Sequence, residues 1–301
     1  MELWRLFLPL VFSAAIAVVS VGFQSKIAAK TASWMAVGGA CGIGLVGFIG
    51  SGLVALQFWA HSSLPNWFAL WCGPLGNNHA TVSETVGVTL SVFVIVGVAR
   101  LAWFTHQHRS AKRTGQKLRS LNNQPVLVAN SNEVFAYAVP GATPLTVVSS
   151  ELLVQLEANE QAIVLAHEEA HHRHRHDRFL LVGRGVAALF PPARVFTRAL
   201  EHALERWADE HAVTVVGDRK LVAITVARTA LLANRHIARL PFGALGFSLA
   251  GPFSTTQRVK SLLRPPQPVP GWALGVSLVA LLSLATQVHH FEGLLRALCP
   301  M

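Results

Sequence analysis

Val164–Arg178 reads VLAHEEAHHRHRHDR, and this stretch places five histidines, three carboxylates and three arginines directly after an apolar lead-in. Within it, His167, Glu168 and His171 fit the pattern H-E-x-x-H. Two histidines four positions apart lie on one face of an α-helix and can share a zinc ion. Glu168 would lie beside that ion, where a carboxylate can take a proton from water that the metal makes more acidic. The stretch therefore predicts a zinc site with Glu168 as general base; the alternative is a solvated, histidine-rich helix end.

The residues around the motif predict that it lies on a long helix. Asn159 is a suitable N-cap, and a largely apolar run follows it, as a buried helix requires. We expect the helix to begin near Asn159 and to include the quoted stretch as its second half. His174 would lie about 10 Å along the axis from His167, too far to bind the same ion. His172 and His176 are expected to be surface groups, or a weak secondary metal site, rather than catalytic ligands.

A catalytic zinc ion keeps three protein ligands, so a third ligand is needed. Asp177 lies ten residues after His167, where metzincins place theirs, but His174 replaces the glycine that turns the chain in those enzymes. Other candidates lie on a predicted helix after a Pro-Pro pair, which carries Glu201, His202, Glu205, Asp209 and His211. Glu205 shares a stripe with alanines that permit close approach, which favours it as the ligand, with Asp209 supporting the site from one turn on. The alternative is a charged face paired with arginines.

The composition is that of a membrane protein. Hydrophobic residues make up 52% of the 301 residues, and charged residues make up 13%, about half of the ~25% usual in soluble domains. About 20 helical residues cross a bilayer core. Four stretches are apolar enough: Leu6–Phe23, Trp34–Ala60, Val82–Phe104 and Gly271–Val288. The run Phe179–Phe190 is shorter and is interrupted by Arg184, so we interpret it as an interfacial or buried helix.

The distribution of basic residues predicts the orientation of these spans. Six lysines and arginines and no acidic residue lie between Arg100 and Ser120, whereas His61–Thr81 has no charged side chain. We expect both segments to be loops, and the positive-inside rule therefore places the basic loop in the cytoplasm and both chain termini outside the cell membrane. The net charge of +10 is explained by this signal and by anionic lipid headgroups, so no direct nucleic-acid binding is expected.

The chain divides into three predicted parts. Residues 1–105 form a three-span module, residues 106–265 a cytoplasmic domain, and residues 266–301 a Pro-rich linker, a fourth span and a short external tail. Within the cytoplasmic domain, Pro125–Ala129, Val134–Ala138 and Leu145–Val148 read as the strands of a small sheet, followed by a short helix near Ser149. The predicted fold is thus a mainly α-helical, four-span membrane protein with an α+β, zincin-like cytoplasmic domain.

The motif H-E-x-x-H, followed by Glu205-Arg206-Trp207-Ala208-Asp209, resembles the gluzincin membrane peptidases of the BlaR/MecR type and, more distantly, the HtpX and CAAX prenyl protease group. The similarity runs from about Val126 to Leu263 and extends to the order of spans and domain. The resemblance implies one zinc ion, Glu168 as general base and Asp209 as a supporting acid. The ligands that it implies are His167, His171 and Glu205.

Two departures from this pattern limit the resemblance. An acidic residue is often found five places after the second histidine, where this chain has His176, with Asp177 one place later. The tail His289–Met301 is far too short for the external penicillin-binding sensor of the antibiotic receptors. The chain is therefore not expected to sense a β-lactam in that way.

The expected function is that of a zinc metalloendopeptidase that cleaves a protein substrate at the cytoplasmic face of the membrane. Its topology favours regulatory signalling by cleavage of a cytoplasmic transcriptional repressor. The alternatives are quality control of membrane proteins, as in the HtpX group, a non-catalytic zinc-binding receptor or scaffold, and a metal transporter. We expect the substrate to bind extended beside an edge strand, with Val134–Ala138 as candidate, and Tyr137, His211 and His236 as candidates for stabilising the oxyanion.

Overall fold

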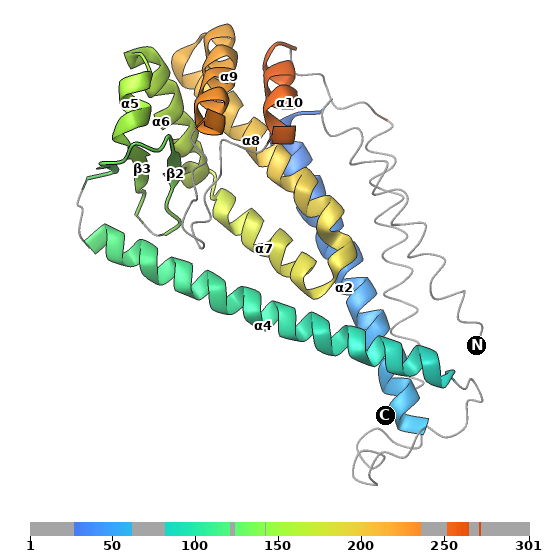
Figure 1. The fold of residues 1–301 in the computed structure, drawn as a ribbon. Coiled ribbons are helices and arrows are strands. Elements are labelled where there is room, and N and C mark those ends of the chain that lie inside the picture. The colour runs from blue at the N-terminus through green and yellow to red at the C-terminus, as the bar shows by residue number, and fades with distance from the viewer. Residues whose placement is uncertain are drawn as a thin grey trace.

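The structure is a computed structural model, and in the part of the chain that it describes, helices predominate and one small sheet lies at one side of them (Figure 1). The described residues are 27–61, 82–120, 124–141, 143–235, 252–264 and 271. The predicted span Leu6–Phe23, the predicted external loop and His236 lie outside these residues, as does the predicted span Gly271–Val288 apart from its first residue.

Two long helices contain the other two predicted spans. Helix α2 (Ala29–His61) has 33 residues and helix α4 (Glu84–Ser120) has 37, and both are long and apolar enough to cross a membrane. At 1.5 Å per residue they measure about 50 and 55 Å, more than a bilayer core of ~30 Å. The basic segment Arg100–Ser120, expected as a loop, is instead the continuation of α4. Neither a glycine-proline pair nor a capping residue separates this basic segment from the apolar part of α4, so the helix continues.

The sheet has the strand order β1-β3-β2, with β1 parallel and β2 antiparallel to β3. Its strands are β1 (Val126–Ala129), β2 (Ala136–Ala138) and β3 (Thr146–Ser149). The three predicted strands are thus present, and the one containing Tyr137 lies at an edge, as expected. Ser149 caps helix α5 (Ser150–Gln155) by accepting a hydrogen bond from the backbone N–H of Leu152, so the predicted helix start is also confirmed.

The quoted stretch does not form one helix. Helix α6 (Ala158–Arg173) ends before His174, Arg175 adopts a left-handed conformation with φ 54°, and helix α7 (His176–Leu189) begins directly after it. The N-cap is Glu157, which forms a capping box with Glu160, so the predicted cap at Asn159 is wrong by two residues. Because the chain turns at Arg175, the first residue of α7 is directed back toward α6.

Helix α7, the 3₁₀ turn η3 (Pro191–Ala193) and helix α8 (Arg194–Val216) form a hairpin packed against α2 and α4 (Figure 1). Glycines make this contact close. A Cβ atom on Gly97 of α4 would lie 2.6 Å from the carbonyl oxygen of Leu189, and one on Gly47 of α2 would lie 2.5 Å from the ring of Phe190. The short apolar run 179–190 is therefore a helix buried against the two long ones.

Two further helices complete the structure on the other side of α8. They are α9 (Arg219–Arg235) and α10 (Pro252–Leu262). Ile163 and Ala166 of α6 share a core with Ala212 of α8, Val222 of α9 and Leu262 of α10. This packing brings α10 against the segment of α8 that carries the predicted ligand.

Candidate metal centre

Helices α6 and α8 pack side by side, and this contact brings the predicted ligands together. His167 and His171 are 3% exposed and lie on the face of α6 that meets α8, where Glu205 is 7% exposed. Alanines on both helices permit the close approach: Ala170 on α6 and Ala208 on α8 are fully buried. The alanines beside Glu205 therefore allow the two helices to approach closely, as expected from the sequence.

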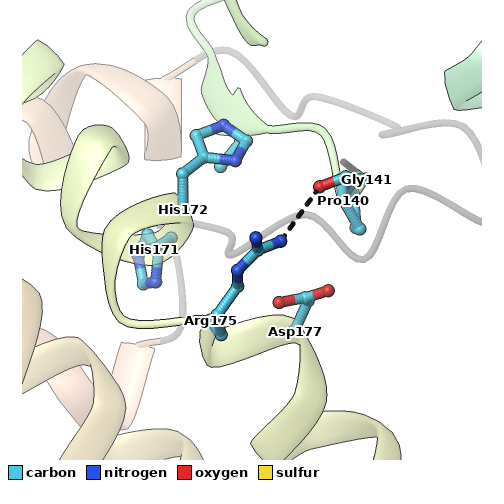
Figure 2. Close-up of a pocket in the computed structure, with 7 residues that line it drawn as sticks. Pro140, Gly141, His171, His172, Arg175 and Asp177 are labelled. Carbon is cyan, nitrogen blue, oxygen red and sulfur yellow. Dashed lines mark hydrogen bonds between the residues drawn. The ribbon is translucent and has the colours of Figure 1, made fainter. Parts of the chain in front are cut away.

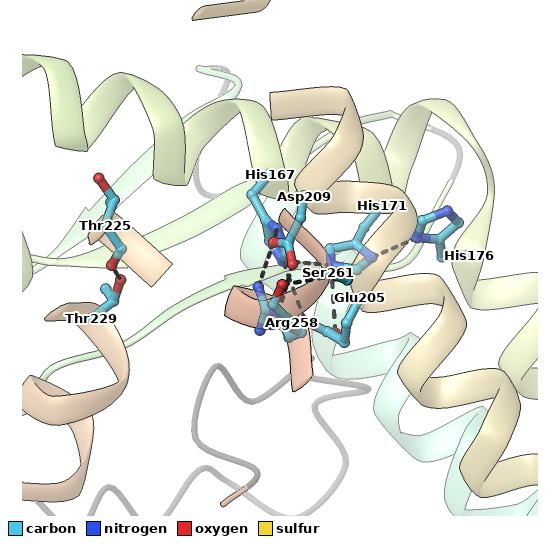
Figure 3. Close-up of polar contacts among 9 residues, drawn as sticks. All are labelled: His167, His171, His176, Glu205, Asp209, Thr225, Thr229, Arg258 and Ser261. Carbon is cyan, nitrogen blue, oxygen red and sulfur yellow. Dashed lines mark hydrogen bonds and ion pairs between the residues drawn. The ribbon is translucent and has the colours of Figure 1, made fainter. Parts of the chain in front are cut away.

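The ligand atoms have the separations that one zinc ion requires (Figure 3). The Nε2 atoms of His167 and His171 lie 3.2 Å apart. The Glu205 carboxylate lies 3.4 Å from Nε2 of His167 and 3.8 Å from Nε2 of His171. Two ligands bound tetrahedrally at about 2.0–2.1 Å from zinc lie about 3.3 Å apart. His167, His171 and Glu205 therefore form a group that can hold a metal ion, and its geometry and donor types fit zinc.

Each histidine is held by its other ring nitrogen. Nδ1 of His167 lies 3.0 Å from Oδ1 of Asp209, and Nδ1 of His171 lies 2.8 Å from Nδ1 of His176. A histidine that offers Nε2 to a metal must carry its proton on Nδ1 and donate it there. Asp209 is placed to accept that bond from His167. His176 accepts it for His171, and the expectation that His176 is a surface group is wrong, because the turn at Arg175 buries it.

Arg258 completes the site and was missed by sequence reasoning. It is fully buried on α10, donates to Asp209 through Nε (2.8 Å) and Nη2 (2.6 Å), and lies 3.0 Å from Glu205 through Nη1. With Glu168, the cluster contains three carboxylates and one guanidinium. With neutral histidines it therefore carries an excess of two negative charges, which a divalent cation balances.

Glu168 is fully buried, and its carboxylate has no side-chain hydrogen-bond partner among the described residues; the backbone of Ala138 offers it a weak hydrogen bond. Burial raises the pKa of this carboxyl to about 7, although the charge of His167 and the Ala138 backbone oppose the shift. A buried carboxyl with so little hydrogen bonding costs free energy, and in native proteins such a group binds an ion or a water molecule or takes part in catalysis. Its pKa near neutrality suits a group that accepts and returns a proton.

The ionisation of the ligands also suits metal binding. Burial by itself lowers the pKa of His167, but hydrogen bonds to Asp209 and Glu205 outweigh it and raise the pKa to about 9. Burial and the charge of His167 hold the pKa of His171 well below its usual value. Burial would raise the pKa of Asp209, but Arg258 holds it well below its usual range. His171 is therefore neutral, whereas a cation that binds His167 must displace a proton.

The alternative third ligand, Asp177, lies elsewhere. It is in the first turn of α7 and lines a small pocket with Pro140, Gly141 and Arg175, on the side of His171 that faces the end of β2 (Figure 2). Nη1 of Arg175 donates to the Gly141 carbonyl oxygen across 3.4 Å. The cluster that can hold a metal contains Glu205 and not Asp177.

The remaining candidates are distributed around the centre. His172 is half-buried, with Nε2 3.0 Å from the Leu145 carbonyl oxygen, so it is not a free surface group. His174 stacks on Trp207 at 4.7 Å between ring centroids and meets His211 edge to face at 5.3 Å. Tyr137 lies half-buried on β2. None of these belongs to the group of ligands defined by the described residues.

Comparison with known proteins agrees with this chemistry. The profile of Peptidase family M48 matches residues 105–235, a segment of less than half the chain that contains all five predicted site residues but not Arg258. No curated protein and no solved structure matches the chain. The chain is thus similar to Peptidase family M48 over residues 105–235, and within this segment lies the buried His-His-Glu cluster that could hold a metal ion.

Proposed function

We propose that this protein is an integral-membrane zinc metalloendopeptidase that cleaves a protein substrate at the cytoplasmic face of the membrane. The observation that carries the proposal is the triangle of His167, His171 and Glu205 beside the buried carboxyl of Glu168, which has no side-chain hydrogen-bond partner among the described residues. The M48 match supports peptide hydrolysis. The lengths and apolar composition of α2 and α4 support membrane insertion, and the basic end of α4 supports a cytoplasmic domain.

In this mechanism His167, His171 and Glu205 hold the zinc ion, which supplies Lewis-acid chemistry that polarises a carbonyl and makes water more acidic. Glu168 accepts the proton of the attacking water on its carboxylate and returns it to the leaving amine. Asp209 and His176 fix the two histidine rings, so the ligands need no rearrangement.

The edge strand β2 is the proposed docking site for the substrate. An extended peptide can add to the free side of an edge strand through backbone hydrogen bonds, which gives affinity with little sequence preference. Strand β2 packs against α6, and Ala138 at its end lines the same pocket as His171. A peptide bound there would run past the metal centre. A cytoplasmic transcriptional repressor is the substrate class that we favour, on the grounds of the proposed topology.

The matched pair Glu168→Gln and Glu169→Gln tests the proposal. The two residues are adjacent, but Glu169 is exposed and lies outside the ligand cluster. We expect Glu168→Gln to lower kcat for cleavage of a denatured-protein substrate by at least about 10²-fold while zinc content is kept, because only the proton acceptor is lost. Glu169→Gln should retain wild-type activity. Cleavage that persists in Glu168→Gln would contradict Glu168 as the proton acceptor, whereas a wild type that holds zinc but cleaves no protein would indicate a zinc-binding receptor or scaffold.

A further inference from the structure

A second charged site lies on the membrane-proximal side of the hairpin, away from the metal centre. It is a cavity of about 310 Å³ between α4, α7 and α8. Four arginines line it together with a single carboxylate: Arg100 of α4, Arg184 of α7, and Arg194, Arg198 and Glu201 of α8. None of the metal ligands lines this cavity, so the proposed peptidase chemistry leaves it without a role.

The positive charge in the cavity is not balanced within the described part of the chain. Glu201 pairs with Arg184, whose Nε and Nη2 atoms lie 2.9 and 2.8 Å from one carboxylate oxygen. Arg100, Arg194 and Arg198 make no hydrogen bond or ion pair with any described residue. Arg100 is half-buried and Arg194 and Arg198 are exposed, so solvent screens their mutual repulsion in part, and an anion bound between the three guanidinium groups would remove it. Guanidinium groups match phosphate oxygens in geometry and charge.

The surrounding side chains place the cavity at the level of lipid headgroups. On α4, Ile95 and Val98 before Arg100 are 66% and 52% exposed, as expected for side chains in contact with acyl chains. Trp103, one turn after Arg100, is 65% exposed, and tryptophan gathers at the membrane interface. On α8, Val195 is exposed beside Arg194. An arginine between an apolar surface and an interfacial tryptophan directs its charge toward the headgroups.

We propose that this cavity binds the phosphate of an anionic phospholipid from the cytoplasmic leaflet. The headgroup phosphate contacts Arg100, Arg194 and Arg198, and the acyl chains lie along the exposed apolar side of α4. The lipid thereby links α4 to the α7–α8 hairpin that leads to the metal centre. The inference rests on the proposed membrane placement and not on the proposed peptidase activity.

The test measures stabilisation by defined lipids in the detergent-purified full-length protein. Dioleoylphosphatidylglycerol should raise Tm of the wild type more than dioleoylphosphatidylcholine does. In the double variant Arg194→Gln/Arg198→Gln this difference should disappear, with the apparent affinity for phosphatidylglycerol at least about tenfold lower. The matched control Arg109→Gln/Arg113→Gln removes the same charge from the exposed basic part of α4 and should keep the wild-type response.

Three results would overturn the proposal. The first is a full phosphatidylglycerol response in the cavity variant, and the second is an equal loss in the control, which would indicate diffuse attraction to charge. The third is the same stabilisation by inorganic phosphate in phosphatidylcholine, which would make the cavity a site for free anions. Zinc content and peptide cleavage are measured separately on each variant. The results of the lipid experiment can therefore be interpreted even if the peptidase proposal fails. Extraction of the protein by alkaline carbonate would refute the membrane placement itself.

Discussion

His176 is the residue that most distinguishes this metal centre from the pattern that the chain resembles. Related peptidases often carry an acid at this place, whereas here a buried imidazole lies 2.8 Å from Nδ1 of His171. Burial lowers the pKa of His176 to about 3, and the neighbouring histidines act in the same direction, so the ring is neutral and can accept a hydrogen bond. A neutral acceptor orients His171 but increases its basicity less than a carboxylate would.

Replacement of His176 should therefore change metal affinity more than it changes folding. We expect His176→Ala to weaken zinc binding by about 10–100-fold, because His171 loses the group that fixes its tautomer. His176→Asp should restore most of the affinity, since a carboxylate can accept the same bond. Competition with a chromogenic chelator measures both, with the exposed His106→Ala as control. Equal losses in the alanine and aspartate variants would show that His176 acts only by packing.

At the scale of elements, glycines decide how the hairpin packs against the long helices. A Cβ atom on Gly97 would meet backbone at Leu189, whereas one on Gly52 of α2 would have no neighbour within 4 Å. Alanine is favoured over glycine inside helices by up to about 1 kcal/mol, so Gly52→Ala should raise Tm slightly. Gly97→Ala should lower it, because the helices must separate. Thermal unfolding in detergent measures Tm of both variants. A shift of Tm in the same direction for Gly52→Ala and Gly97→Ala would contradict the close contact at Gly97.

The elements also show what the sequence can and cannot predict. His167, His171 and Glu205 could be predicted, because the helical period fixes positions within one helix and the alanines beside Glu205 indicate a close contact. The break at Arg175 could not be predicted, because the residues on both sides of it favour a helix and nothing in the sequence indicates that this arginine adopts a left-handed conformation. Arg258 could not either: it lies 49 residues from Asp209 and belongs to no motif. A contact of that kind depends on the tertiary fold alone.

At the scale of the whole molecule, the metal centre and the long helices form one packed unit. Arg206, next to Glu205, donates to the Ile27 carbonyl oxygen at 3.0 Å, which ties the start of α2 to the helix that carries the third ligand. Helix α2 continues along α8 and α7, and α10 joins the cluster through Arg258. A change at the ligands should therefore affect the stability of the whole unit and not only that of a local loop.

Removal of zinc should then lower the stability of the entire protein. A ligand present at about 1,000 times its Kd stabilises the folded state by roughly 4 kcal/mol, which corresponds to roughly 6 °C in Tm for a chain of this size. We expect treatment with 2,6-pyridinedicarboxylate to lower Tm of the wild type by about that amount, and zinc to restore it. His171→Ala should start near the lower Tm and not respond. A wild type that loses its zinc without a change in Tm would contradict this prediction. It would show that packing alone holds the cluster of carboxylates, Arg258 and histidines, and that the ion binds to a site that is already formed without stabilising the fold.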